Sequence, residues 1–191
     1  MPGLTAKNKA KSFGEDVKKT IIALCVALTA CTASYQNQDL AGSGAIPTHL
    51  SASSLVYVAM PADGAYESTV YPGSGRTTAQ AVAAAFARHG SAVTIADATA
   101  PRERVIADAR AAGAQFAAVP VISHWEPRAT EWSGRPSRMS VSLAMIDVPS
   151  GAVVSNVELS GRSRIISFTS TSPDSLLREP IGKYVDGLYS R

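Results

Sequence analysis

Cysteine and long apolar runs are scarce in this sequence of 191 residues, and so is charge of one sign in excess. The two cysteines are Cys25 and Cys31, so the chain beyond Cys31 can hold neither a disulfide bond nor a cysteine-ligated zinc ion. Residues 1–30 carry five of the 18 basic and two of the 15 acidic residues, which leaves 13 of each in residues 31–191. This balanced remainder shows no basic patch, which excludes nucleic acid as an expected partner.

The first apolar run is too short to cross a membrane. It covers residues 20–30, 11 residues, about half of the roughly 20 that a membrane-spanning helix needs. Lys18 and Lys19 precede it and small residues close it, a pattern typical of a secretory signal peptide. A buried amino-terminal helix is the alternative, but the flanking lysines favour export. We therefore predict that residues 1–30 are a lipoprotein signal peptide, cleaved from the mature chain.

Residues 1–16 fit this leader badly. Glu15 and Asp16 are unusual in front of a signal's apolar run, and the signal is complete from Val17 onward. Bacteria can start translation at a valine codon. We expect that residues 1–16 are not translated, and that in the full chain they lack order whereas residues 17–30 form a helix.

The end of the apolar run carries a more specific motif than the run itself. Leu28-Thr29-Ala30-Cys31 resembles the bacterial lipobox. The resemblance implies that the thiol of Cys31 is diacylglycerylated, that the peptide is cut before it, and that the new amino terminus is acylated, with palmitate as the expected chain. Three acyl chains exceed the two signals that stable anchoring needs. Thr32 follows where an aspartate would resemble an inner-membrane retention signal, so the resemblance implies the outer membrane, with the domain facing the periplasm.

Composition divides the chain after the leader into two parts. Residues 31–54 are rich in Ser, Gly, Ala and Gln without an apolar period, which predicts a lipidated flexible tether spanning roughly 25 Å. Residues 55–191 predict a single domain, in which Pro180 should kink or split the last helix. Strands are expected over residues 55–60, 93–96, 116–123, 139–148, 152–159 and 164–168, and helices over about 77–90, 101–113 and 172–188.

This order of elements, β-α-β-α-β-β-β-α, predicts an α/β (α+β) fold: a mixed sheet of about five to six strands with helices packed on it. The order resembles the amino-terminal domain of the periplasmic protein TolB and the periplasmic domain of the curli-secretion lipoprotein. In several such domains an aspartate and a glycine flank the hairpin turn, as Asp147 and Gly151 do here.

Two segments carry a closer resemblance. YPGSGRTTAQAVAAAFARHG and HWEPRATEWSG resemble the signature segments of an uncharacterised family of proteobacterial lipoproteins, domain of unknown function 4823. The likeness extends from about Leu55 to Leu188. It implies a lipoprotein context, and no activity is assigned to the family.

The first of these segments begins with Tyr71–Gln80, which looks like a phosphate-binding loop. A Walker loop would need a glycine at Val70 and a lysine at Arg76, so no nucleotide is expected. Thr77 and Gln80 have the spacing of a capping box, which predicts a helix that begins at Thr77. An exposed anion site formed by Arg76 and free backbone amides is the alternative.

The second segment gathers both tryptophans of the chain with charged residues: Trp125, Glu126, Arg128, Glu131 and Trp132. The rings could pack over the sheet edge, or the five residues could form a surface for a protein or sugar partner. Glu126 and Glu131 could act as a glycosidase pair, and His124 with Glu126 could bind a metal. No supporting base or third ligand accompanies either pair, so we expect no catalytic residue and no metal.

Together these features predict an outer-membrane lipoprotein that is not an enzyme, uses no cofactor, and serves as an accessory or interaction module in the cell envelope. Its expected partners are the membrane, through Cys31, and an unidentified envelope protein or glycan. The alternative is an envelope enzyme that acts on cell-wall glycan with Glu126 or Glu131. A homo-oligomeric ring like the curli channel is disfavoured, because no long amphipathic strands that would build a barrel are visible.

Overall fold

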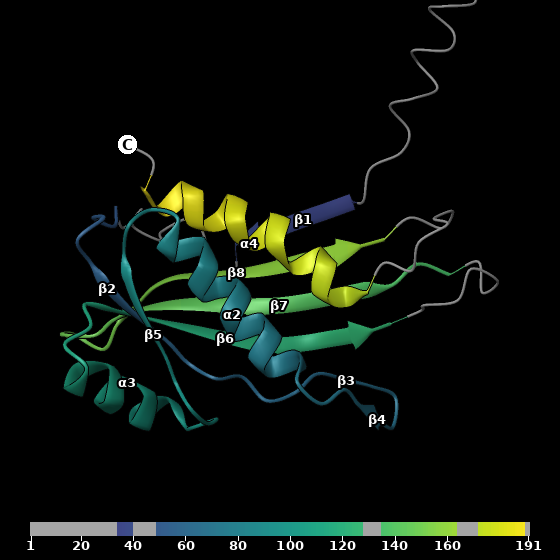
Figure 1. The fold of residues 1–191 in the computed structure, drawn as a ribbon, viewed down its shortest axis with the longest axis horizontal. Helices are drawn as coiled ribbons and strands as arrows, with labels where there is room; N and C mark the ends of the chain where they lie inside the picture. The colour runs from purple at the N-terminus through teal and green to yellow at the C-terminus, as the bar shows by residue number, and fades with distance from the viewer. Residues whose placement is uncertain (1–33, 40–48, 128–134, 164–171, 190–191) are drawn as a thin grey trace, which may run out of the picture. The chain divides into compact units, whose positions relative to one another are not determined.

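The computed structural model describes residues 34–39, 49–127, 135–163 and 172–189 (Figure 1). The predictions for residues 1–30, and for the lipidated Cys31, concern residues outside these ranges. The elements in chain order are β1 (Ser34–Asp39), β2 (Leu55–Val58), β3 (Ala65–Tyr66), β4 (Thr69–Val70), α2 (Ser74–Ala87), β5 (Ala92–Ile95), α3 (Arg102–Ala111), β6 (Phe116–Glu126), β7 (Arg138–Asp147), β8 (Val153–Arg162) and α4 (Pro173–Tyr189).

The strands form a six-stranded sheet and a small separate hairpin. The order in the sheet is β1-β8-β7-β6-β2-β5, and the hairpin is β3-β4. β2 pairs in parallel with β5 and β6, whereas the pairs β6–β7, β7–β8 and β8–β1 are antiparallel. The predicted class, an α+β fold with a mixed sheet and helices packed on it, is confirmed for the described part of the chain.

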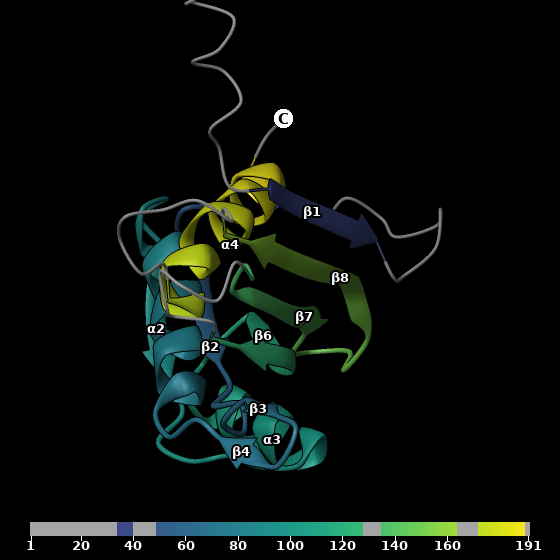
Figure 2. The same ribbon diagram turned by 90° about the vertical axis from the view of Figure 1, so that its right-hand side faces the viewer.

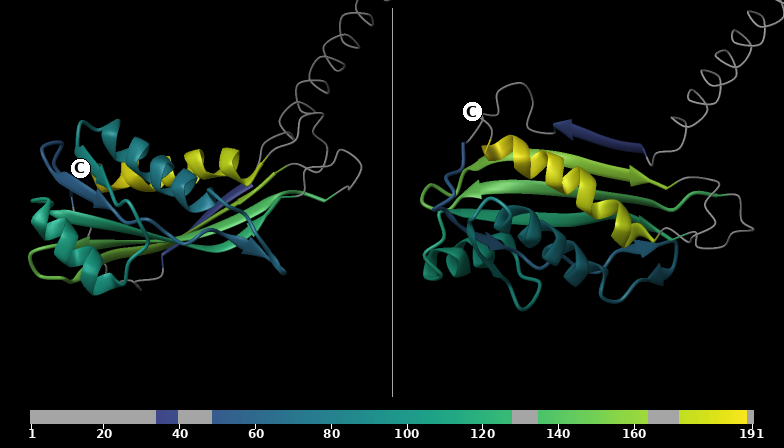
Figure 3. Two further views of the ribbon diagram at one scale, coloured as in Figure 1. Left: turned by 60° about the horizontal axis from the view of Figure 1, so that its bottom comes forward. Right: turned by 45° about the horizontal axis from the view of Figure 1, so that its top comes forward.

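The helices form two layers around the sheet. α2 and α4 lie side by side over one face, and α3 lies over the other (Figure 3). The larger core lies under α2 and α4, where Phe86 and Leu177 have no exposed surface. A smaller core lies under α3, where Ala109 packs with Tyr57 and Ala117. The apolar period predicted for α2 is confirmed, since its apolar residues at that spacing are buried.

α4 runs through Pro180 as one helix from Pro173 to Tyr189. Of the two outcomes predicted at Pro180, a kink or a split, the split is wrong. A proline inside a helix removes one hydrogen bond and crowds the preceding turn. Here apolar residues before and after Pro180, such as Leu177 and Ile181, are fully buried in the same core, which stabilises one continuous helix despite the lost hydrogen bond.

The sixth strand of the sheet is β1, which falls within the segment predicted as a flexible tether. Each of its residues has a partner on β8, from Ser34 opposite Arg162 to Asp39 opposite Val157. The tether prediction is therefore wrong for these six residues, because backbone pairing with an open strand edge needs no apolar period in the sequence. The sixth strand predicted at residues 164–168 lies outside the described residues.

The turn between β7 and β8 is formed by the predicted aspartate and glycine. The N–H of Gly151, which has a positive φ of 71°, donates to the carbonyl of Asp147 at 2.7 Å. The N–H of Ser150 donates to Oδ2 of Asp147 at 3.0 Å. This tight turn sets the register of β7 against β8, and so decides which of their side chains share a face.

Candidate functional site

The amino-terminal end of α2 is closed by Asp63 from the preceding loop. Oδ1 of Asp63 accepts hydrogen bonds from the backbone N–H groups of Gly73 (3.1 Å) and Gly75 (2.8 Å). A carboxylate here satisfies free amides and is favoured by the helix dipole. The predicted capping box is wrong, because α2 begins at Ser74, and Thr77 lies one turn inside it with its N–H bonded to the carbonyl of Gly73 (2.9 Å).

The alternative interpretation of this segment was an anion site built from Arg76 and free amides. Arg76 is exposed on α2. The amides of Gly73 and Gly75, however, already bind the carboxylate of Asp63. A second anion would meet that negative charge at short range, so the geometry does not support an anion site at Arg76.

β6 continues past Ser123, where a strand end was predicted, and carries Trp125 into the core. A register shift between Ile122 and His124 changes the alternation of sides, so that Ile122 and Trp125 both pack into the core under α2 and α4. Trp125 is 3% exposed, and a Cβ added at Gly64 would lie 2.6 Å from the Trp125 Cβ. Of the two alternatives for Trp125, packing against the sheet or exposure on a partner surface, this burial favours packing, because the bulge turns the ring inward.

Glu126 is also buried, with 6% of its side chain exposed, so it is not part of an open partner surface. Its Oε2 lies 3.0 Å from Nε2 of His124, whose ring meets that of Tyr66 edge-on at 5.6 Å. His124 and Glu126 thus face each other, as a metal pair would require. The described residues contain no group of three such ligands, however. The remaining predicted members of this site, Arg128, Glu131 and Trp132, lie outside the described residues.

The face of β6, β7, β8 and β1 opposite α2 and α4 is polar. Figure 2 shows α2 and α4 on one side of these strands, and α3, the one described helix on the other side, packs against Ala117 and Ile146. The register places cross-strand partners in rows on this polar face. One row is Glu126, Arg138, Arg162 and Ser34, and the next is His124, Ser140, Ser160 and Gln36. All four residues of the second row, and all of the first row except Glu126, line a hollow of about 530 Å³, which Glu158 also lines.

One end of the polar face is basic. Arg138 and Arg162 lie directly opposite each other on β7 and β8, and both side chains are exposed. Neither makes a hydrogen bond or ion pair with another described residue. Glu158, four residues before Arg162 on β8, accepts a hydrogen bond from the hydroxyl of Ser123 at 2.8 Å. Like charges directly opposite each other destabilise a sheet, so this arginine pair is an unusual feature that packing does not explain.

A second hollow, of about 820 Å³, lies between α2 and α4. Small side chains on α2, including Ala81 and Ala84, leave the space open, while Arg88, Arg178 and Asp174 stand on its sides. Arg178 is exposed and makes no ion pair with the described residues. Such a groove has room for one or two side chains of a partner.

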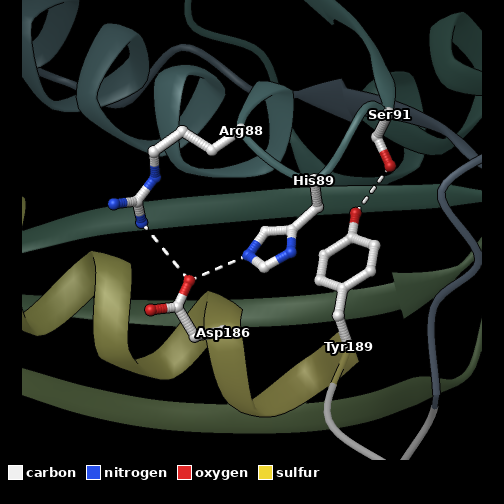
Figure 4. Close-up of polar contacts among 5 residues, drawn as sticks. All are labelled: Arg88, His89, Ser91, Asp186 and Tyr189. Atoms are coloured by element: carbon white, nitrogen blue, oxygen red, sulfur yellow. Dashed lines mark hydrogen bonds and ion pairs between the residues drawn. The ribbon is translucent and has the colours of Figure 1, made fainter.

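A polar cluster joins the carboxyl ends of α2 and α4 (Figure 4). Oδ1 of Asp186 lies 2.8 Å from Nε2 of His89 and 3.4 Å from a guanidinium nitrogen of Arg88. The ring of His89 stacks on that of Tyr189, and the Tyr189 hydroxyl lies 2.6 Å from Oγ of Ser91. Burial raises the pKa of Tyr189 above its ordinary value of 10.0, and the hydrogen bond with Ser91 lowers it by less.

This cluster fastens the two helices together. It contains a serine, a histidine and an aspartate, but the partner of the Ser91 hydroxyl is Tyr189 and not His89. A nucleophilic serine needs a base within hydrogen-bond reach, so the arrangement is not that of a catalytic triad.

Sequence reasoning missed Asp63, the arginine pair and the helix cluster. One signal could have found the polar face: Ser140 and Ser142 alternate with buried residues along β7 and therefore share a side of the strand. The pairing of Arg138 with Arg162 could not be read from that pattern. It depends on the turn and on the register shift between β7 and β8.

These features define a single α+β domain with an open polar sheet face and a helix-lined groove. The chain belongs to the family described as "Domain of unknown function (DUF4823)", whose model matches residues 48–188. The family membership predicted from the two signature segments is confirmed. No curated protein matches the chain.

The chain is similar to several solved structures, to different degrees. The PelC dodecamer from Paraburkholderia phytofirmans has a TM-score of 0.61 at 18% identity, covering 84% of this chain and 99% of that one. Lipoprotein GNA1162 from Neisseria meningitidis has a TM-score of 0.44 at 14% identity, covering 70% and 94%. The LpoB carboxy-terminal domain from Salmonella enterica has a TM-score of 0.36 at 14% identity, covering 62% and 86%. At these identities the likeness concerns the fold. Within the described ranges, no helix has both the length and the apolar character that crossing a bilayer requires.

Proposed function

We propose that this chain is an outer-membrane lipoprotein, anchored through acylated Cys31, whose domain is a non-enzymatic interaction module of the cell envelope. The observation that carries the proposal is the place of the lipobox-like sequence Leu28–Cys31 relative to the fold. The first described strand begins at Ser34, just beyond Cys31. Cleavage before Cys31 would keep every residue of the described ranges in the mature chain, and would place an acyl anchor three residues before β1.

The interaction role is supported by two surfaces that the fold leaves open. One is the polar face of β6, β7, β8 and β1, and the other is the groove between α2 and α4. The PelC structure of the same fold is a dodecamer. Other copies of this chain are therefore candidate partners beside other envelope proteins and glycans.

The anchor is tested by substituting each cysteine separately. Cys31→Ser should abolish incorporation of a palmitate analogue and leave either an unprocessed precursor or a protein absent from the outer-membrane fraction. Cys25→Ser is the matched control, because Cys25 lies inside the apolar run and should be dispensable. Equal labelling and equal outer-membrane recovery of Cys31→Ser and the wild type would refute the anchor.

The interaction role is tested by site-specific photo-crosslinking in cells. Lys183 is the single lysine after Cys31, so amine-reactive reagents would sample little of the surface. A photoreactive residue at Gln80 in the groove, or at Val121 on the polar face (54% exposed), samples the two open surfaces directly. Glu103 on α3 serves as the control position.

A discrete adduct at Gln80 or Val121, and none at Glu103, is the expected result. Adducts of equal yield at all three positions would contradict a defined interaction surface. Release of soluble fragments from cell-wall glycan by the purified protein, lost in Glu126→Gln, would contradict the non-enzymatic assignment.

A further inference from the structure

We propose that Arg138 and Arg162 bind phosphate groups of membrane lipids, and so orient the domain on the membrane beside its anchor. The inference rests on the proposed lipid anchor at Cys31. It gives a role to an arginine pair that the packing of the domain does not explain. It also names the surface of the domain that faces the bilayer.

The geometry of Arg138 and Arg162 favours the binding of an anion. Cross-strand partners in an antiparallel sheet have Cβ atoms roughly 5 Å apart, so Arg138 and Arg162 repel each other unless an anion lies between them. Arginine forms paired hydrogen bonds with phosphate oxygens, which makes it well suited to phosphate groups. Both side chains are exposed and neither is paired with a described residue, so no contact within the described ranges has to break for binding.

The carboxylates nearby do not neutralise the pair by contact. Glu126, next to Arg138 in its row, is buried and lies against His124. Glu158 is bound by Ser123 and lies four residues along β8 from Arg162, about 13 Å at the usual rise of a strand. Neutral side chains of the next row, such as Ser160, lie between Arg162 and Glu158. Glu158 lines the same hollow as the two arginines, but at this end of the sheet the exposed charged side chains of the row are Arg138 and Arg162, with Glu126 buried beside them.

That end is the one at which the anchor would emerge. Ser34, the first residue of β1, lies directly opposite Arg162 on β8. In the processed chain only Thr32 and Ala33 separate Ser34 from the acylated Cys31. Three Cα–Cα steps span at most about 11 Å, so the anchor holds Ser34 close to the lipid headgroups. Arg162 is the neighbour of Ser34, and Arg138 follows on the next strand.

This proximity favours lipid phosphate over free phosphate. A basic residue near an anionic bilayer strengthens attachment by roughly fivefold, and the attraction fades within about one Debye length. With an anchor on the adjacent strand, both arginines can reach the headgroup layer without extra chain. We expect the two together to favour the docked orientation by roughly 25-fold.

The test uses the acylated protein in nanodiscs of phosphatidylcholine, with or without phosphatidylglycerol. Because the sulfur of Cys31 would be consumed by the lipid, an added cysteine is the single free thiol for a fluorophore. Ser140→Cys places the label beside the arginine pair, and Val153→Cys places it toward the opposite end of the sheet on β8. Headgroup spin labels then quench a fluorophore that lies near the surface.

The label at residue 140 should be quenched more than the label at residue 153, and more strongly with phosphatidylglycerol present. Arg138→Gln with Arg162→Gln should lower the docked-to-undocked ratio roughly 25-fold without lowering the Tm. Arg104→Gln, which removes an exposed arginine from α3, should change nothing. Equal quenching at both labels, or quenching unaffected by the double variant, would overturn the proposal.

Two further measurements distinguish an error in the proposed lipid contact from an error in the proposed anchor. In the first, quenching is measured in inorganic phosphate and, for comparison, in sodium chloride of the same ionic strength. Loss of quenching in phosphate but not in sodium chloride would show a site for free phosphate and overturn the lipid assignment. The mass of the amino-terminal peptide is measured on the same sample. A peptide without acyl chains would refute the proposed anchor, whereas an acylated peptide with no orientation would refute the arginine contact alone.

Discussion

Removal of the Asp63 carboxylate should destabilise the domain through α2, although Asp63 lies outside that helix. In Asp63→Ala the amides of Gly73 and Gly75 lose their acceptor. Loss of an N-cap costs about 0.5–2 kcal/mol, and the favourable charge at the helix terminus adds about 0.3–1 kcal/mol. Because Asp63 is exposed and water can replace part of each bond, we expect a loss of about 1.5–2 kcal/mol.

Urea unfolding followed by circular dichroism measures this loss, and thermal unfolding should show a Tm lower by roughly 3–8 °C for a domain of this size. Asp63→Asn keeps an acceptor oxygen and should lose only the charge contribution, about 0.3–1 kcal/mol. Thr77→Ala should cost less than about 0.5 kcal/mol, because Thr77 lies inside the helix on a partly exposed side. If Thr77→Ala proved as destabilising as Asp63→Ala, the assignment of the cap to Asp63 would be refuted.

Gly64→Ala should destabilise the domain by about 1–3 kcal/mol in urea unfolding, since its Cβ would lie 2.6 Å from the Trp125 Cβ. Gly187→Ala in α4 meets no atom within 4 Å and should instead stabilise by about 0.5–1 kcal/mol; equal effects would contradict the close packing at Gly64. Burial raises the pKa of Tyr189 above 10.0, so the folded chain keeps a proton that the unfolded chain loses, and stability should fall as pH rises from 10.0 through the folded pKa. Tyr189→Phe should make this alkaline loss shallower between about pH 9 and 11; an unchanged slope would show that other tyrosines cause it.

Much of the fold could be predicted because apolar residues recur at regular spacing in its main helices and strands. The alternation of Val141, Leu143 and Met145 with serines in β7, and the apolar face of α2, are decided by burial of one side of each element. The turn at Asp147 and Gly151 is decided by residues three to four apart. Each of these features depends on neighbours in sequence, so the sequence pattern suffices to predict it.

The candidate site was predicted less well, because it depends on contacts between distant residues. Packing and a partner surface both stayed open for Trp125 and Glu126 in the sequence, and the structure buries both side chains, the tryptophan ring through the register shift in β6. The helix cap was assigned to Thr77, but Asp63 closes the helix instead, by binding the amides of Gly73 and Gly75 ten and twelve residues away. Neither a β-bulge nor a hydrogen bond between residues on opposite sides of a loop produces a regular period in the sequence.

The sequence alone determined the class of fold, the family and the lipobox-like segment at Cys31, since each depends on residue types at short spacing. Only the tertiary structure decided that β1 joins the sheet at its edge, and that Ser34, Arg162 and Arg138 stand in one row. The physical reason is that strand pairing is made by backbone groups, which every residue carries. The partner and register of an edge strand are therefore set by which strand is left open and by the turns that align it, and not by the side chains of the strand itself.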